Sequence, residues 1–111
     1  MVLILQPKIG YLRLLTDKGD PKEYWFEFRK TFRKTAEFKH WGTDKQKEDL
    51  WRDWSARKKM SREKREAELL SWMRGLKGTR DEVMEKVTMD VRYWVIGDEK
   101  DDIVRDALRG R

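Results

Sequence analysis

The stretch DPKEYWFEFRKTFRKTAEFKHW, residues 20–41, decides the fold, because it joins a helix start to a dense aromatic pattern. Asp20 followed by Pro21 is typical of an N-cap with proline at the first helical position. We therefore expect a helix from Pro21 to about Phe38. At 100° per residue, its apolar side chains fall on one broad face and its cations share the other. The apolar face holds Tyr24, Trp25, Phe28, Phe32, Ala36 and Phe38, and the cationic face holds Lys22, Arg29, Lys30, Arg33 and Lys34.

Phe26 is the exception, because it falls in the middle of the cationic face. An aromatic ring among five cations is either a platform on which a nucleobase stacks or a contact to another part of the fold. Both interpretations stay open, since a domain of two layers could cover both sides of so aromatic a helix.

The composition indicates one folded domain, residues 1–111, from which a basic helical segment, residues 44–66, could protrude. Of the residues, 43% are charged, but 12% are aromatic and six are tryptophan, which is far more than a disordered chain carries. The absence of cysteine excludes disulfides and thiolate metal sites.

The chain has no asparagine, few glutamines and abundant Lys, Glu and Arg. This composition is typical of proteins from hot environments, so we predict a thermophilic source. The apolar run at residues 1–5 is too short for a signal peptide or a membrane span. We expect a cytoplasmic protein, in the host cytoplasm if it is viral or from a mobile element, with no membrane partner.

The N-terminal part of the sequence is the part in which we favour β structure. Residues 2–5 and 11–15 flank Pro7 and Gly10 and are interpreted as two short strands or an extended entry segment. Thr43 or Asp44 caps the next helix. Residues 44–75 form either one long helix or two that meet near Met60 and Ser61, where Ser61 is an acceptable helix start.

The C-terminal part is helical. Gly75 to Gly78 is a helix stop, and Thr79 with Glu82 makes a capping box. We favour a helix from there to about Ile96, with a strand after Asp90 as the alternative, and a last short helix capped by Gly97-Asp98. The predicted fold class is therefore mainly α with a minor α+β character: a small helical domain of four to five helices with a short N-terminal β segment or hairpin.

Positive charge is concentrated in the middle of the chain. Residues 29–65 hold 14 basic and 6 acidic side chains, a net charge of +8, whereas residues 1–28 are neutral and residues 66–111 have a net charge of −2. This concentration favours a polyanion-binding surface there. The alternative, a charged surface that is merely solvated, is about equally favoured. Residues 55–66 are too polar to be buried, so we expect them in solvent or against a charged partner.

Aromatic rings beside cations are suited to stacking bases and neutralising phosphates. Trp51 and Trp54 lie near Lys47 and Lys58 on helical spacing and repeat the arrangement around Phe26. The candidate nucleic-acid-binding residues are Lys22, Arg29, Lys30, Arg33, Lys34, Lys47, Arg57, Lys58 and Lys59, and the candidate stacking residues are Phe26, Trp51 and Trp54.

Catalytic signatures are absent from the sequence. His40 is the only histidine, so neither a Cys/His zinc site nor a nucleophile triad can be assembled. The glycines lack the spacing of a phosphate loop. We expect no enzyme, no catalytic residue, no metal site and no cofactor.

The leading hypothesis is a small, basic, non-enzymatic helical module that binds DNA or RNA. The alternative is a protein–protein interaction module, such as an inhibitor, adaptor or assembly factor, because large aromatics and Arg also form interface hot spots. The run Gly19-Asp20-Pro21 followed by Trp25, Phe28, Phe32, Trp41 and Leu50 resembles the helical capsid segment of retrotransposon Gag proteins over less than a third of the chain. That resemblance implies self-association and transfers no residue roles.

Overall fold

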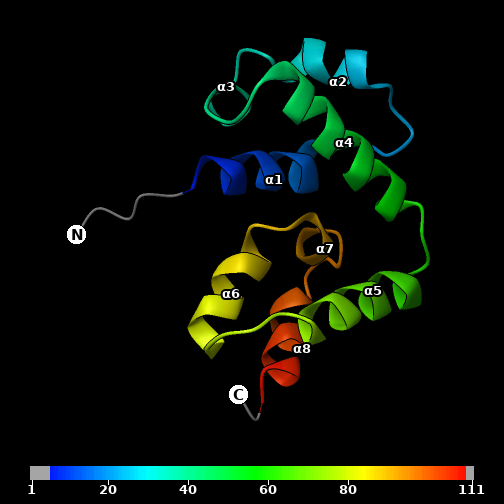
Figure 1. Ribbon diagram of the computed structural model, residues 1–111. Helices are drawn as coiled ribbons and strands as arrows, with labels where there is room; N and C mark the ends of the chain where they lie inside the picture. The colour runs from blue at the N-terminus through cyan, green and yellow to red at the C-terminus, as the bar shows by residue number, and fades with distance from the viewer. Residues whose placement is uncertain (1–5, 110–111) are drawn as a thin grey trace.

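The computed structural model describes residues 6–109, and all the regular secondary structure within them is helical (Figure 1). The helices are α1 (Pro7–Lys18), α2 (Trp25–Phe32), α3 (Ala36–Lys39), α4 (Asp44–Lys58), α5 (Arg62–Arg74), α6 (Arg80–Thr88), α7 (Val91–Trp94) and α8 (Lys100–Ala107). The prediction of a mainly helical fold is confirmed. The predicted number of helices is wrong, because eight are present in the described range instead of four or five.

The predicted strand at residues 11–15 is wrong, since these residues lie in α1. Tyr11, Leu12, Leu14 and Leu15 are all buried, including adjacent pairs. A strand places adjacent side chains on opposite faces, whereas a helix in the interior can bury both. Pro7 in the first turn begins this helix. The other predicted strand, residues 2–5, lies outside the described residues.

The helix predicted from Pro21 to Phe38 begins later and is broken in two. The Asp20 carboxylate accepts a hydrogen bond from the Lys22 amide at 2.9 Å, which closes a turn instead of capping a helix. Tyr24 is then extended, and α2 begins at Trp25. After Phe32 the chain turns, and Thr35 caps the short helix α3 by accepting a hydrogen bond from the Phe38 amide.

Side-chain caps divide the rest of the chain. The capping box predicted at Thr79 with Glu82 is confirmed. Of the two caps considered for α4, Thr43 is the one present, and it forms a capping box with Gln46 that was not predicted. Residues 44–75 form two helices, and Ser61 caps the second one. The single helix predicted to run to about Ile96 is divided, because α6 ends at Thr88 and Asp90 caps the separate helix α7 through the Arg92 amide. Residues 91–94 are helical and not a strand. The cap predicted at Gly97-Asp98 is wrong, because α8 begins after Glu99, whose side chain makes no cap hydrogen bond.

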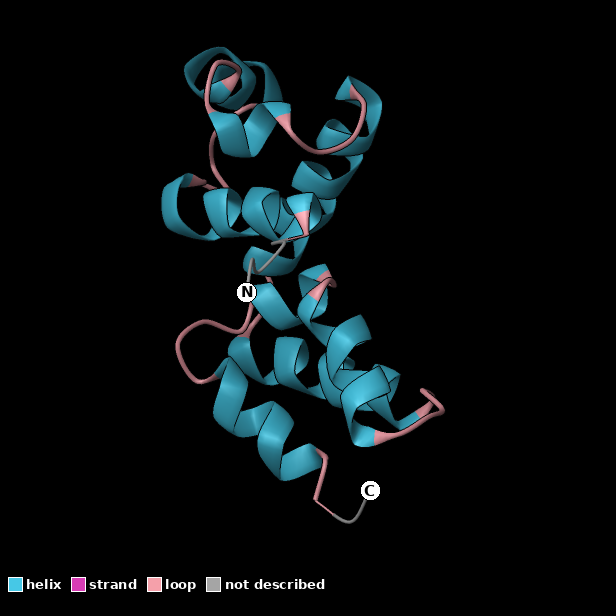
Figure 2. Ribbon diagram, turned by 90° about the vertical axis from the view of Figure 1, so that its left-hand side faces the viewer, coloured by secondary structure: helices cyan, strands magenta, loops and turns pink. Residues whose placement is uncertain are grey.

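The helices form two stacked groups with α7 between them (Figures 1 and 2). Helices α1 to α4 make one group, and α5, α6 and α8 make the other. Helix α7 packs against α1, α4, α5 and α6. The radius of gyration is 14.5 Å, somewhat above the value of about 13 Å expected for a compact domain of this length. Its principal-axis extents of 45, 39 and 22 Å show that the molecule is flattened along one direction.

The two groups bury different side chains around one continuous core. The α1–α4 group is aromatic: Phe28 contacts the rings of Trp25, Phe32 and Trp51 at centroid distances between 4.9 and 6.4 Å. The other group is built on aliphatic side chains, namely Leu69, Met73, Val83, Val87, Val104 and Leu108. The tryptophan-rich middle of the sequence thus supplies the aromatic cluster of the α1–α4 half of the core, and α1 adds Tyr11, Leu12, Leu14 and Leu15.

Gly19, the residue that follows α1, lies against the Trp54 ring of α4, and this contact gives a test of the fold. A Cβ atom at Gly19 would lie 2.5 Å from the Leu15 carbonyl oxygen and 2.6 Å from the Trp54 ring. We expect Gly19→Ala to lower the free energy of unfolding by about 1–3 kcal/mol, as overpacking does. Gly10 lies inside α1 with open space around it. Gly10→Ala should therefore raise the free energy of unfolding by about 0.5–1 kcal/mol.

Chemical denaturation of both variants beside the parent protein measures these changes. We expect the free energy of unfolding to fall in Gly19→Ala and to rise in Gly10→Ala. Equal stabilities would contradict the close approach of α1 and α4 at Gly19.

Candidate nucleic-acid interface

Five of the nine candidate phosphate-binding side chains are exposed and make no ion pair within the described residues. They are Lys22, Lys30, Arg33, Lys34 and Lys59. Lys30 lies on α2, and Arg33 and Lys34 follow its end directly. Lys22 belongs to the turn before α2, and Lys59 follows the end of α4. Four of the five free cations therefore lie on α2 and its flanking turns, and the fifth, Lys59, lies at the end of α4.

The other four candidates are engaged within the fold. Arg29 pairs with Asp44 at 3.3 Å and remains partly exposed. Lys47 is buried, with its ammonium group 4.8 Å from the centre of the Phe38 ring, a cation–π contact. Lys58 is half-buried, and burial together with the nearby charge of Arg65 lowers its pKa. Arg57, the fourth, has the most extensive contacts.

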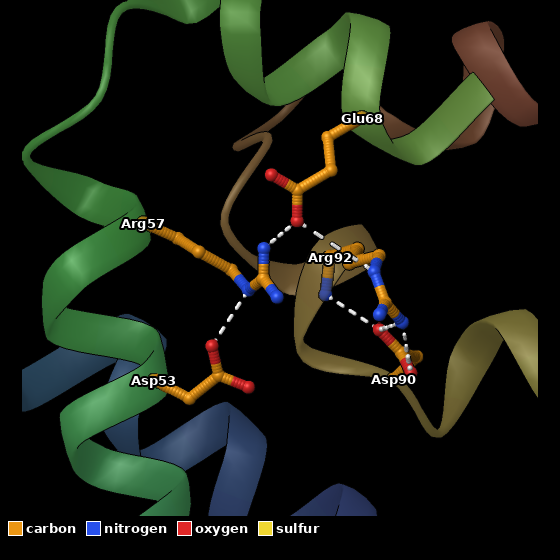
Figure 3. Close-up of polar contacts among 5 residues, drawn as sticks. All are labelled: Asp53, Arg57, Glu68, Asp90 and Arg92. Carbon is orange, nitrogen blue, oxygen red and sulfur yellow. Dashed lines mark hydrogen bonds and ion pairs between the residues drawn. The ribbon is translucent and has the colours of Figure 1, made fainter. Parts of the chain in front are cut away.

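Figure 3 shows the Arg57 side chain reaching from α4 between two carboxylates. Its Nε lies 2.8 Å from Asp53, and its terminal nitrogen pairs with Glu68 on α5. Glu68 also faces the Arg92 guanidinium at 3.7 Å, and Arg92 pairs with Asp90 at 3.0 Å. The charge of Arg57 is therefore neutralised by an ion-pair network that joins α4, α5 and α7.

The three candidate stacking residues have different environments. Phe26 is 67% exposed, so its ring is open to solvent. Trp51 and Trp54 are only 5% and 1% exposed. Both point into the core from α4, where Trp51 packs against Trp25 at 6.0 Å between centroids. Neither ring face is therefore available to a base from solution in this structure.

The sequence missed the most exposed aromatic side chain. Tyr24 is 75% exposed, although helical spacing from Pro21 placed it on the apolar face. It is the extended residue before α2, so the spacing of that helix does not apply to it. Asp20, which favours turns as well as helix caps, was the one available signal. Tyr24 and Phe26 are the only large hydrophobic side chains that are exposed in the part of the chain the structure describes.

An open hollow of about 460 Å³ lies beside Tyr24, between the turn at residues 21–24 and α4. Its lining from the turn is Pro21, Lys22, Glu23 and Tyr24, and its lining from α4 and the residue after it is Trp51, Arg52, Ser55, Ala56 and Lys59. The Ser55 hydroxyl donates a hydrogen bond to the Pro21 carbonyl at 3.0 Å and fastens the turn to the helix. Ser55 is buried for this reason, contrary to our expectation for residues 55–66.

The hollow carries more positive than negative charge. Its lining contains three cationic side chains, Lys22, Arg52 and Lys59, and one carboxylate, that of Glu23. Burial, together with the nearby charges of Glu27 and Asp20, raises the pKa of Glu23. Arg52 is paired with Glu48 at 2.7 Å, which leaves the two lysines as the unpaired cations. This arrangement suits an anionic ligand with an aromatic part.

Residues 6–109 contain no group of three or more His, Cys, Asp or Glu side chains arranged to hold a metal ion. Within the same range, no helix has both the length and the apolar character needed to cross a bilayer.

No family model, curated protein or solved structure shows significant similarity to this chain.

The contacts of Arg57 predict a role in stability that the exposed Lys59 lacks. Arg57→Ala leaves Glu68 without its nearest partner, and we expect the free energy of unfolding to fall by about 1–3 kcal/mol, between the values for exposed and buried pairs. Lys59→Ala removes the same charge from an exposed side chain and should change stability by less than about 0.5 kcal/mol. Denaturant titration of the two variants makes the comparison. Equal stability would mean that the network in Figure 3 contributes nothing.

Glu23 gives a dependence on pH. A raised carboxyl pKa in the folded state means that ionised Glu23 costs stability, and this cost appears as the pH rises through the carboxylate range. We expect Glu23→Gln to be more stable than the parent protein at neutral pH. The difference should vanish below the unfolded-state pKa of about 4.3. Urea denaturation at several pH values tests this, and a difference that grows toward low pH would contradict it.

Proposed function

We propose that this protein is a small, non-enzymatic, basic helical module that binds nucleic acid through phosphate contacts and aromatic stacking. One observation carries the proposal: the two exposed aromatic rings, Tyr24 and Phe26, occur on the same short segment as the unpaired cations Lys30, Arg33 and Lys34. Rings stack on bases, and cations neutralise phosphates, so the two kinds of group recognise the two parts of a nucleotide.

The spacing on α2 supports joint action. Lys30 and Arg33 follow Phe26 by four and seven residues, so the three side chains lie along one stripe of the helix and of the residue after it. A ligand that runs along this stripe would meet a ring first and two positive charges after it. Arg29 borders the stripe but shares its charge with Asp44, which makes it a weaker phosphate contact.

The contrast with the other end of the molecule supports the same proposal. On α8, the exposed Arg105 pairs with Asp102 at 3.5 Å, and just beyond that helix Arg109 pairs with Asp106 at 3.1 Å. Carboxylates three residues away neutralise those cations. Within residues 6–109, neither Lys30 nor Arg33 makes an ion pair, although Glu27 lies three residues before Lys30. Positive charge near α2 is therefore left available to an external anion.

A second candidate function is protein binding. Exposed aromatic rings beside arginine are also the usual content of interface hot spots, and Tyr24 and Phe26 fit that description. Salt distinguishes the two candidates, because apolar anchors are screened much less than phosphate contacts. Affinity for a protein partner that persists in high salt would favour the second candidate.

The double variant Lys30→Ala/Arg33→Ala tests the proposal. We expect it to bind a fluorescein-labelled oligonucleotide more weakly at low salt and to flatten the dependence of log affinity on log salt by about 1.4–1.8, since each lost phosphate contact removes roughly 0.7–0.9. Fluorescence anisotropy across a series of salt concentrations is the measurement.

The control is Arg105→Ala/Arg109→Ala, which changes the net charge by the same amount at the opposite end of the molecule. We expect it to keep most of the parental affinity and slope. If both double variants lose affinity equally, the effect follows net charge and the α2 surface is not the site.

A further inference from the structure

We infer that the hollow beside Tyr24 receives one unstacked base, which would make the protein selective for single-stranded over double-stranded nucleic acid. This inference rests on the proposed function and specifies the form of nucleic acid that it binds. Three features of the hollow carry it: its size and rigidity, its aromatic lining and its unpaired cations.

The hollow is of suitable size and is held in shape by the fold. Its volume of about 460 Å³ lies within the range of roughly 300–1,000 Å³ that is usual for small-ligand sites. The Ser55 hydrogen bond holds Pro21 against α4, and the Asp20 carboxylate fixes the turn through the Lys22 amide at 2.9 Å. A ligand would therefore meet walls that are already positioned.

Two aromatic side chains line this space. Tyr24 supplies an exposed ring, and Trp51 lines the hollow from α4 while remaining buried in the core. The Trp51 indole nitrogen is buried and has no hydrogen-bond acceptor among the described residues. Every base has a flat π face, so stacking on Tyr24 does not require a particular sequence.

The charges around the hollow match the backbone of a strand whose base enters it. Lys22 belongs to one wall and Lys59 to the other, and neither makes an ion pair within residues 6–109. Phosphates on both sides of an inserted base could contact them. Glu23 is the only carboxylate in the lining, and the three cations outnumber it.

A duplex cannot use this site without being opened. Its bases are stacked on their neighbours and paired, so a base enters a hollow only after it leaves the stack. A single strand already exposes its bases. A duplex would therefore contact only the cationic surface around α2, whereas a single strand would contact that surface and the hollow.

The experiment compares two ligands and four variants by fluorescence anisotropy at low salt. The ligands are a labelled 12-nucleotide thymidine strand and a labelled 12-base-pair duplex. Tyr24→Ala removes the ring, and Tyr24→Phe keeps it. Ala56→Leu fills part of the hollow from α4, and Ala67→Leu adds the same group to an exposed position on α5, outside the hollow. Thermal melting confirms that each variant is folded.

We expect the parent protein to bind the single strand more tightly than the duplex. Tyr24→Ala and Ala56→Leu should weaken single-strand binding by about 5-fold to 150-fold, the range for the loss of one stacked base, and leave duplex binding unchanged. Tyr24→Phe and Ala67→Leu should bind as the parent protein does.

Equal binding of strand and duplex, or an unchanged affinity of Ala56→Leu for the strand, would overturn the inference. If Lys30→Ala/Arg33→Ala still weakens both ligands in that case, the proposed function stands and only the hollow is excluded. If the parent protein binds neither ligand at low salt, the proposed function fails and the inference fails with it.

Discussion

The burial of α7 between the two helical groups is the constraint on which the rest of the structure depends. A helix of four residues has no stability of its own, because nucleation costs more than one turn of hydrogen bonds returns. Its conformation is imposed by Asp90, which caps it, and by the burial of Val91, Tyr93 and Trp94. Since α7 packs against α1, α4, α5 and α6, it is the element through which the aromatic and aliphatic halves share one core.

Arg92 on α7 helps to fix the orientation of the neighbouring helices α4 and α5. Its guanidinium lies 4.7 Å from the centre of the Trp72 ring on α5 and faces Glu68, which also pairs with Arg57 on α4. Charges in this partly buried region are costly unless they are paired, so the network favours the arrangement that pairs them all. Helix α4 is thereby fixed on its inner side, and its other side is left to form the wall of the hollow. The interior ion pairs and the candidate site are opposite faces of the same helix.

Local signals predicted what local physics decides. The capping box at Thr79 and the helix start at Ser61 were predictable because their hydrogen bonds span only three residues. The strand predicted at residues 11–15 failed because alternation and helical spacing coincide over five residues, and only burial against other helices distinguishes them. The positive segment, residues 29–65, holds only part of the candidate site, because Lys22, Tyr24 and Phe26 precede it. A cation can be neutralised by a carboxylate that is distant in the sequence, as Arg57 is by Glu68. Such pairs cannot be predicted from composition.

The aromatic membership of the site depends on a competition at Asp20. If the Asp20 side chain capped a helix at Pro21, Tyr24 would lie on the apolar face with Trp25 and Phe28. Instead the carboxylate closes a turn on the Lys22 amide, and the helix begins four residues later. The aromatic core keeps Trp25 and Phe28, while Tyr24 is left outside the helix and beside α4. In either conformation, helix cap or turn, the Asp20 carboxylate would accept a hydrogen bond from the Lys22 amide. Packing therefore selects the turn, through the hydrogen bond from Ser55 to Pro21 and the contact of the Trp51 ring with Trp25. The hollow, its exposed ring and the close approach at Gly19 therefore have one origin, the docking of this turn on α4.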